Sequence, residues 1–129
     1  MLTEQLSDFL YEVRYDSLPS KAVDNAKLYL GDLLGVGGIW RSYFAAGDGQ
    51  QEATAWNSGL ERFSCEHAAA LNAACAHVMD MDDVHNASIT HLGAVTIPAA
   101  LAVGQKLHRS GREVLAAIAA GYEIGARVG

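Results

Sequence analysis

The sequence predicts an all-α protein of about five helices. Alanine is concentrated in the second half, where 16 of the 22 alanines follow Cys65, and alanine has the highest helix propensity of any residue. The two prolines, Pro19 and Pro98, stand where helices can begin. No segment alternates apolar and polar residues in the way that is typical of a half-buried strand. Helices are therefore expected to form the core.

Two helices are expected in the first third of the chain. The first covers about Thr3–Val13, where apolar residues recur on one helix face: Leu2, Leu6, Phe9, Leu10 and Val13. The second begins after a break at Ser17–Ser20, and its apolar residues are spaced by three or four positions: Val23, Ala26, Leu30 and Leu33. The polar, glycine-rich stretch 45–64 is expected to be a loop, with Glu52–Trp56 as a short extended piece.

Three further helices are expected, over about Cys65–Asp83, Ala94–Leu107 and from Ser110 onward. Ser110 is followed three residues later by Glu113, which is the pattern of a capping box at a helix start. The apolar pattern is still helical where the chain stops. We therefore expect residues 1–129 to be an incomplete helical domain of a longer protein.

Composition excludes several classes of protein. Nine Lys and Arg against fifteen Asp and Glu give a net charge of −6, and nucleic-acid binding requires clustered cations. The longest apolar stretch, Leu92–Gly104, is shorter than the ~20 residues of a membrane span. Cys65 and Cys75 lie about 15 Å apart along one predicted helix, too far for a disulfide. We expect a cytoplasmic protein with neither a nucleic-acid nor a membrane partner.

Side chains suited to acid–base chemistry concentrate between residues 77 and 91. They include three of the five histidines and three aspartates: His77, Asp80, Asp82, Asp83, His85 and His91. Carboxylates near a helix C-terminus are disfavoured by the helix dipole, so a functional reason for them is expected. If the helix continues to Asp83, Asp82 points about 160° away from Asp80 around the helix axis.

These side chains are expected to differ in role. Asp80, flanked by two methionines on a mostly apolar helix, is expected to be buried and to face the same cavity as His91. Asp82 is expected to point away, on a solvated helix end. His77, on an alanine-rich face, is expected to be a hydrogen-bonded core histidine.

Two chemistries fit this segment. One is a metal site, because His and Asp are both ligands, but their spacing matches no ligand pattern and we expect no bound metal. The other is proton transfer by an Asp–His pair, which needs only two groups aimed into one cleft. Neither Cys65 nor Cys75 has neighbouring cations that would favour a reactive thiolate.

The same segment resembles the MmgE/PrpD family, which includes 2-methylcitrate dehydratase, cis-aconitate decarboxylase and iminodisuccinate epimerase. The resemblance is carried by the aspartate-rich run from Asn72 to His85 and by two pieces after it, Thr90–Ala94 and Ile97–Ala102. Supporting pieces occur in the family's order over the rest of the chain: Asp32–Gly35, Glu52–Trp56, Ser110–Gly111 and Gly121–Glu123.

The resemblance implies the N-terminal portion of a large helical domain, which in this family is joined to a smaller α+β lid and usually forms a homodimer. It implies metal-independent, cofactor-free lyase or epimerase chemistry on small polycarboxylates, most closely that of 2-methylcitrate dehydratase. Asp80 and His91 match catalytic positions that line the family's active site. His85 matches a frequent histidine for which we expect a substrate-binding role.

Three positions depart from the family pattern. Val84 stands where threonine is common, Leu92 replaces the usual proline, and Gly31 replaces a polar residue. The loss of a hydroxyl at Val84 bears on which acid is the substrate. A non-catalytic helical module, or a subunit completed by a second polypeptide, is the alternative interpretation. We expect the 129-residue chain alone to be inactive and to form a homo-oligomer.

Overall fold

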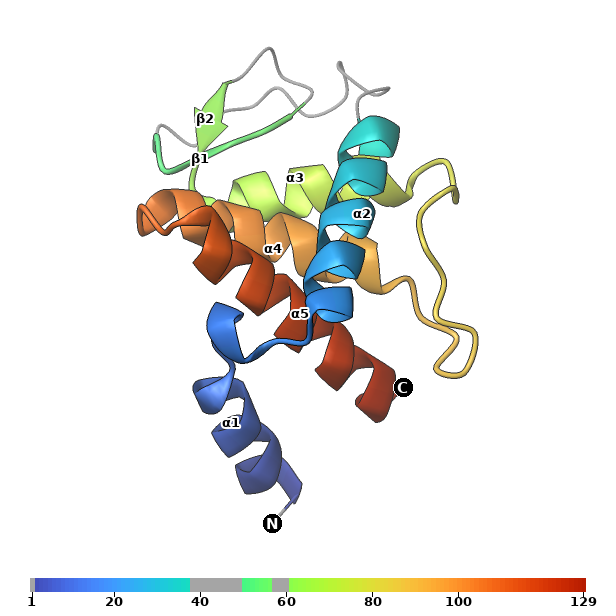
Figure 1. Cartoon of the computed structure of the whole chain (residues 1–129). Helices are drawn as coiled ribbons and strands as arrows, with labels where there is room; N and C mark the ends of the chain where they lie inside the picture. Colours follow the sequence, from blue (N-terminus) through green and yellow to red (C-terminus); the bar gives the residue numbers. More distant parts are fainter. Residues whose placement is uncertain (1, 38–49, 57–60) are drawn as a thin grey trace.

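Five helices and one pair of short strands form the part of the chain that the structure describes, residues 2–37, 50–56 and 61–129 of a computed structural model (Figure 1). The all-α prediction is confirmed. In chain order the elements are α1 (Leu2–Glu12), a 3-10 turn η1 (Tyr15–Ser17), α2 (Ser20–Gly37), β1 (Ala53–Thr54), β2 (Arg62–Phe63), α3 (Cys65–His77), α4 (Leu92–Lys106) and α5 (Gly111–Val128).

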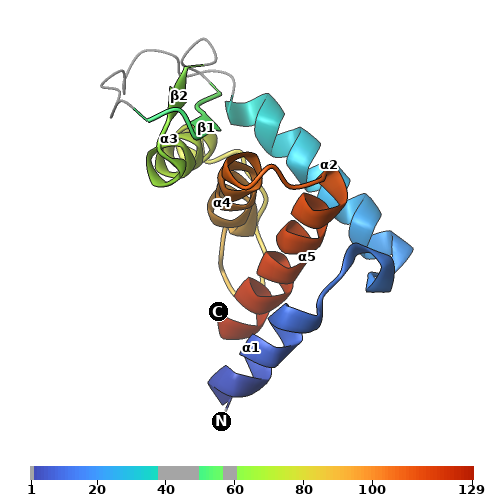
Figure 2. The same cartoon turned by 90° about the vertical axis from the view of Figure 1, so that its left-hand side faces the viewer.

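Helix α4 holds the central position. It packs against α3, α5, α2 and β1, and Figure 2 shows it between α3 and α5. Small and branched side chains from four helices meet there in one buried cluster: Ala26, Leu33, Ala76, Ile97 and Ile118. In both views α1 projects away from this body. Within the described ranges, no helix is both long and apolar enough to cross a membrane.

The strand pair is attached to two helices by side-chain amides. β1 and β2 are antiparallel, with Ala53 opposite Phe63. From α3, the buried Asn72 donates to the Thr54 carbonyl (2.9 Å) and accepts from the Trp56 amide (2.9 Å). From α4, Gln105 accepts from the Thr54 amide (2.7 Å). The predicted extended piece at 52–56 contains β1, whereas its partner strand was not expected from the sequence.

The start of α5 is as predicted. Ser110 Oγ accepts from the Glu113 amide (3.4 Å), and the Glu113 carboxylate accepts from the Ser110 amide (2.8 Å). The hydrogen bond from the Ser110 amide, followed by one from the Ser110 hydroxyl to the same carboxylate, lowers the pKa of Glu113. The capping box therefore fixes where α5 begins.

The end of α3 is where the prediction was wrong. The helix was expected to reach Asp83 but ends at His77. The Asp80 amide turns back to the His77 carbonyl (2.9 Å), and Asp80 has φ 52°, in the left-handed region, which ends a right-handed helix. Helix α4 begins two residues earlier than predicted, at Leu92.

The loop between α3 and α4 is anchored on α5 by Asp83. The Tyr122 hydroxyl donates to Asp83 Oδ1 (3.0 Å), and the Tyr122 ring stacks on Tyr29 of α2 with centroids 4.9 Å apart. Gly93, in the first turn of α4, makes room for this contact. A Cβ at Gly93 would overlap the Asp83 carboxylate and lie 2.7 Å from the Tyr122 hydroxyl oxygen.

Gly93→Ala should therefore destabilise the protein. We expect a loss of about 1–3 kcal/mol in the free energy of unfolding, because the added methyl forces the loop or Tyr122 to move. Gly111→Ala is the matched control, since a Cβ at Gly111, also in a first helical turn, meets nothing within 4 Å. Urea denaturation of both variants measures the difference. Equal stability of the two variants would contradict the close approach at Gly93.

The Tyr122 hydroxyl should limit stability at alkaline pH. Burial first, and then the Asp83 carboxylate, raise the pKa of Tyr122 well above its ordinary value. The unfolded chain then ionises before the folded one, so this contribution is full below about pH 10 and falls as the pH rises further. We expect the stability advantage of the wild type over Tyr122→Phe to shrink across that range in pH-dependent denaturation. An advantage that stays constant with pH would disprove this.

Candidate active site

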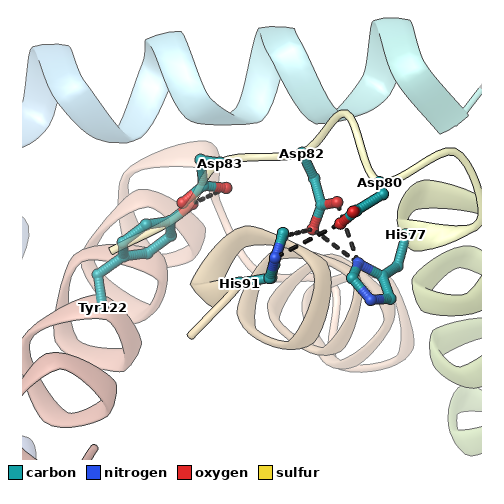
Figure 3. A network of polar contacts seen from close by, with 6 residues as sticks. All are labelled: His77, Asp80, Asp82, Asp83, His91 and Tyr122. Atoms are coloured by element: carbon teal, nitrogen blue, oxygen red, sulfur yellow. Dashed lines mark hydrogen bonds and ion pairs between the residues drawn. The ribbon is translucent and has the colours of Figure 1, made fainter. Parts of the chain in front are cut away.

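Four acid–base side chains meet where α3 ends and α4 begins. His77 is the last residue of α3, Asp80 and Asp82 lie on the loop, and His91 is the residue just before α4. One ligand atom from each lies within 4.8 Å of the others (Figure 3). The structure thus brings the predicted pair Asp80 and His91 together and adds His77 and Asp82 to them.

Asp82 lies at the buried side of this cluster. Its side chain is 0% exposed, with Oδ1 3.0 Å from His77 Nδ1 and Oδ2 3.3 Å from His91 Nδ1. The expectation that Asp82 points away into solvent was wrong. That expectation used helical angles beyond His77, where the chain is no longer helical.

Asp80 lies on the solvent side. Its carboxylate is 79% exposed, and its Oδ1 is 3.5 Å from His91 Nε2. Burial is therefore the reverse of what the sequence predicted, since Asp82 is buried and Asp80 is open. An exposed carboxylate beside an imidazole nitrogen can be reached by a small molecule.

His91 contacts both aspartates, each through a different ring nitrogen. The side chain is 29% exposed and makes no cap hydrogen bond to α4, so both ring nitrogens are left to the aspartates. The ring packs edge-on against His77, with centroids 4.7 Å apart. His77 is itself half-exposed (52%), which corrects the expectation of a core histidine.

His85 is not part of the cluster. Its Nδ1 is 2.8 Å from Ser88 Oγ, and its backbone pairs with Thr90 within the loop. With Tyr29 and Tyr122 it lines a separate cavity of about 330 Å³. The substrate-binding role expected for His85 stays a prediction.

The cluster could hold a tetrahedrally bound cation only after contraction. Ligand atoms up to 4.8 Å apart are wider than the ~3.4 Å of a tetrahedral site with bonds near 2.1 Å. His91 contacts Asp80 and Asp82 through different nitrogens. Metal-free chemistry stays a prediction.

The thiols lie elsewhere. Cys65 and Cys75 are both buried, and burial is the main cause that raises the pKa of Cys65. A raised pKa leaves little thiolate at neutral pH, which agrees with the expectation that Cys65 is not a nucleophile.

Sequence reasoning missed His77 and Asp82 as members of the site. One signal could have found them, because three aspartates in what would be a last helical turn are unfavourable and indicate an earlier helix end. If the helix ends before Asp80, helical side-chain angles no longer apply to this segment. Asp82 is then not required to point away from Asp80.

The chain is similar to known proteins over almost its whole length. The chain is 28% identical to the cis-aconitate decarboxylase-like protein oryM of Aspergillus oryzae (strain ATCC 42149 / RIB 40), over 99% of this chain and 30% of the relative. The chain thus spans about a third of that relative's length. No solved structure matches it. The family described as MmgE/PrpD N-terminal domain matches residues 4–129, and the chain therefore belongs to the MmgE/PrpD family.

Proposed function

We propose that this chain carries the proton-transfer groups of a metal-independent lyase that acts on small polycarboxylates. The observation that carries the proposal is the contact of His91 Nε2 with the exposed Asp80 carboxylate at 3.5 Å. Histidine changes charge nearest neutral pH of all side chains, which suits a group that both takes and gives protons. In this proposal His91 and Asp80 are the catalytic residues.

Two reactions fit this pair. Dehydration removes a proton from a carbon next to a carboxylate and expels hydroxide from the neighbouring carbon. Decarboxylation releases carbon dioxide and leaves a carbon that must take up a proton. Each needs one acid–base group at the reacting carbon, so a single His–Asp pair could serve either. Family membership supports both, and the relative's name favours decarboxylation of cis-aconitate over dehydration of 2-methylcitrate.

The substrate's charge must be balanced from elsewhere in the protein. Among the described residues, the ion pairs of Asp80 and Asp82 are with histidines, and two aspartates repel an anionic acid. Binding a polycarboxylate calls for Arg or Lys. We propose that these cations come from parts of the protein outside this segment, and that a homo-oligomer and a lid domain complete the site.

Asp80→Asn and His91→Asn should each abolish proton transfer. Asn tolerates the left-handed backbone of position 80, so Asp80→Asn removes the charge and keeps the turn. We expect each variant to lower kcat/KM by about 10²-fold or more. The assay is carried out in the longest natural polypeptide that contains this segment, with cis-aconitate and 2-methylcitrate. It follows carbon dioxide release and the ultraviolet absorbance of the double bond.

His108→Asn is the matched control for these variants. His108 is exposed, also has positive φ, and lies after α4, outside the cluster. Its activity should equal that of the wild type. Full activity in Asp80→Asn and His91→Asn would contradict the proposed catalytic roles. Inactivity of the wild type toward both acids would contradict the proposed substrates.

Removal of metals should leave the activity unchanged. The distances within the cluster are too wide for a preformed tetrahedral site, and the proposed chemistry uses no Lewis acid. The measurement is dialysis against a chelator, followed by elemental analysis and assay. Stoichiometric zinc, iron or manganese that survives dialysis, or activity that returns only on adding one of them, would contradict metal independence.

A further inference from the structure

The buried Asp82 carboxylate has no part in the proton transfer proposed above. Its side chain is 0% exposed, whereas that of Asp80 is 79% exposed, and both carboxylates contact His91 (Figure 3). Its ion pairs among the described residues are with the two histidines. A carboxylate buried in this way needs N–H donors. Both histidines are therefore expected to turn an N–H toward Asp82.

The two nitrogens of His91 face different carboxylates. Nδ1 lies 3.3 Å from Asp82 Oδ2, and Nε2 lies 3.5 Å from Asp80 Oδ1. A neutral imidazole carries one N–H, so one of these contacts is a donor contact and the other presents a lone pair. The Nδ1 atom is buried and has no aligned hydrogen bond, although the distance to Asp82 is within reach of one after a small ring rotation.

The burial of Nδ1 decides between the two tautomers. If the proton were on Nε2, the Nδ1 lone pair would face the buried Asp82 carboxylate, and two acceptors would oppose each other away from water. If the proton is on Nδ1, Asp82 gains a donor and the Nε2 lone pair faces the exposed side. Water or substrate can approach there. With the proton on Nδ1, the two buried groups of this contact, the Nδ1–H of His91 and the Asp82 carboxylate, can form a hydrogen bond with each other.

We propose that Asp82 is a positioning residue, which holds the Nδ1–H of His91 and so makes Nε2 the atom that takes and gives the proton. This inference rests on the proposed function for the identity of the reaction. Asp82 acts through His91 and does not touch substrate. His77 supports it with a second Nδ1 contact to the same carboxylate, at 3.0 Å.

In this proposal His91 both takes up and gives up the transferred proton. When Nε2 takes a proton from the substrate carbon, the ring becomes an imidazolium with an N–H on each nitrogen, and the electron pair of the C–H bond stays on the substrate. The positive ring then contacts both the Asp82 and the Asp80 carboxylate. In dehydration Nε2 gives this proton to the departing hydroxide, which leaves as water, and the neutral Nδ1–H form is restored. In decarboxylation the imidazolium gives its Nε2 proton to the carbon that has lost carbon dioxide, and in both reactions Asp82 only orients the ring, as the carboxylate of a catalytic triad does.

The tautomer of His91 is a direct test that needs no turnover. Long-range ¹H–¹⁵N correlation NMR of ¹⁵N-histidine-labelled protein distinguishes a protonated ring nitrogen from an unprotonated one, and His91→Asn assigns the signal. At a pH where the ring is neutral, we expect Nδ1 to carry the proton. A proton on Nε2 in the wild-type protein would overturn the proposal whether or not any variant folds.

Asp82→Asn and Asp83→Asn form a matched pair of variants. Both remove one carboxylate from adjacent positions, but Asp83 contacts Tyr122 rather than His91. We expect Asp82→Asn to move part of the His91 population to the Nε2–H form, and Asp83→Asn to leave the tautomer unchanged. An unchanged tautomer in a folded Asp82→Asn protein would also overturn the proposal.

Kinetics separate this inference from the proposed function. In an active polypeptide, Asp82→Asn should lower kcat by about 10²-fold or more with little change in KM, because substrate contacts are not removed. If His91 is required for activity but Asp82→Asn keeps the wild-type kcat, the positioning role fails and the proposed function stands. If His91 holds the Nδ1–H form but the protein turns over neither acid, the proposed function fails instead.

Discussion

Asp82 places a carboxylate in the protein interior between the end of α3 and the start of α4, and the chain on both sides is arranged around it. His77 approaches from α3 at 3.0 Å and His91 from the α4 side at 3.3 Å. To bring both rings to one carboxylate, α3 must stop at His77 and the chain must reverse at Asp80. The same reversal sends Asp80 outward. The separation of a buried aspartate from an exposed one thus follows from one buried charge.

Local sequence signals predicted the helices better than they predicted the site. The start of α5 followed from Ser110 and Glu113, whose hydrogen bonds span only three residues. The end of α3 had one local signal, the three aspartates that follow it, whereas the contact of Asp82 with His91 had none, because His91 lies 14 residues after His77 and contacts Asp82 only once the chain has folded back. The pairing of Asp80 with His91 was predicted, but which aspartate is buried was not. Side-chain angles around a helix have no meaning beyond its last residue.

The cluster has side chains suited to proton transfer but offers little attraction for an anion. It combines two histidines with two aspartates, in a chain whose net charge is −6. Such a site favours a positive ring in a reaction intermediate more than a negatively charged acid in the ground state. This division suits a protein in which binding and proton transfer are contributed by different segments, and the chain spans 30% of the relative that it matches. A reaction is accelerated when the site stabilises the transition state more strongly than it stabilises the bound substrate.

The absence of a side chain at Gly93 restricts how this sequence can diverge. Asp83, Gly93 and Tyr122 come from a loop and two helices, and their atoms leave no room for one further carbon. A larger residue at 93 would require the Asp83 carboxylate and the Tyr122 hydroxyl to move apart, which weakens the contact that anchors the loop. The effects of substitutions at these three positions are therefore expected to be non-additive, because each residue sets the room that is left to the other two.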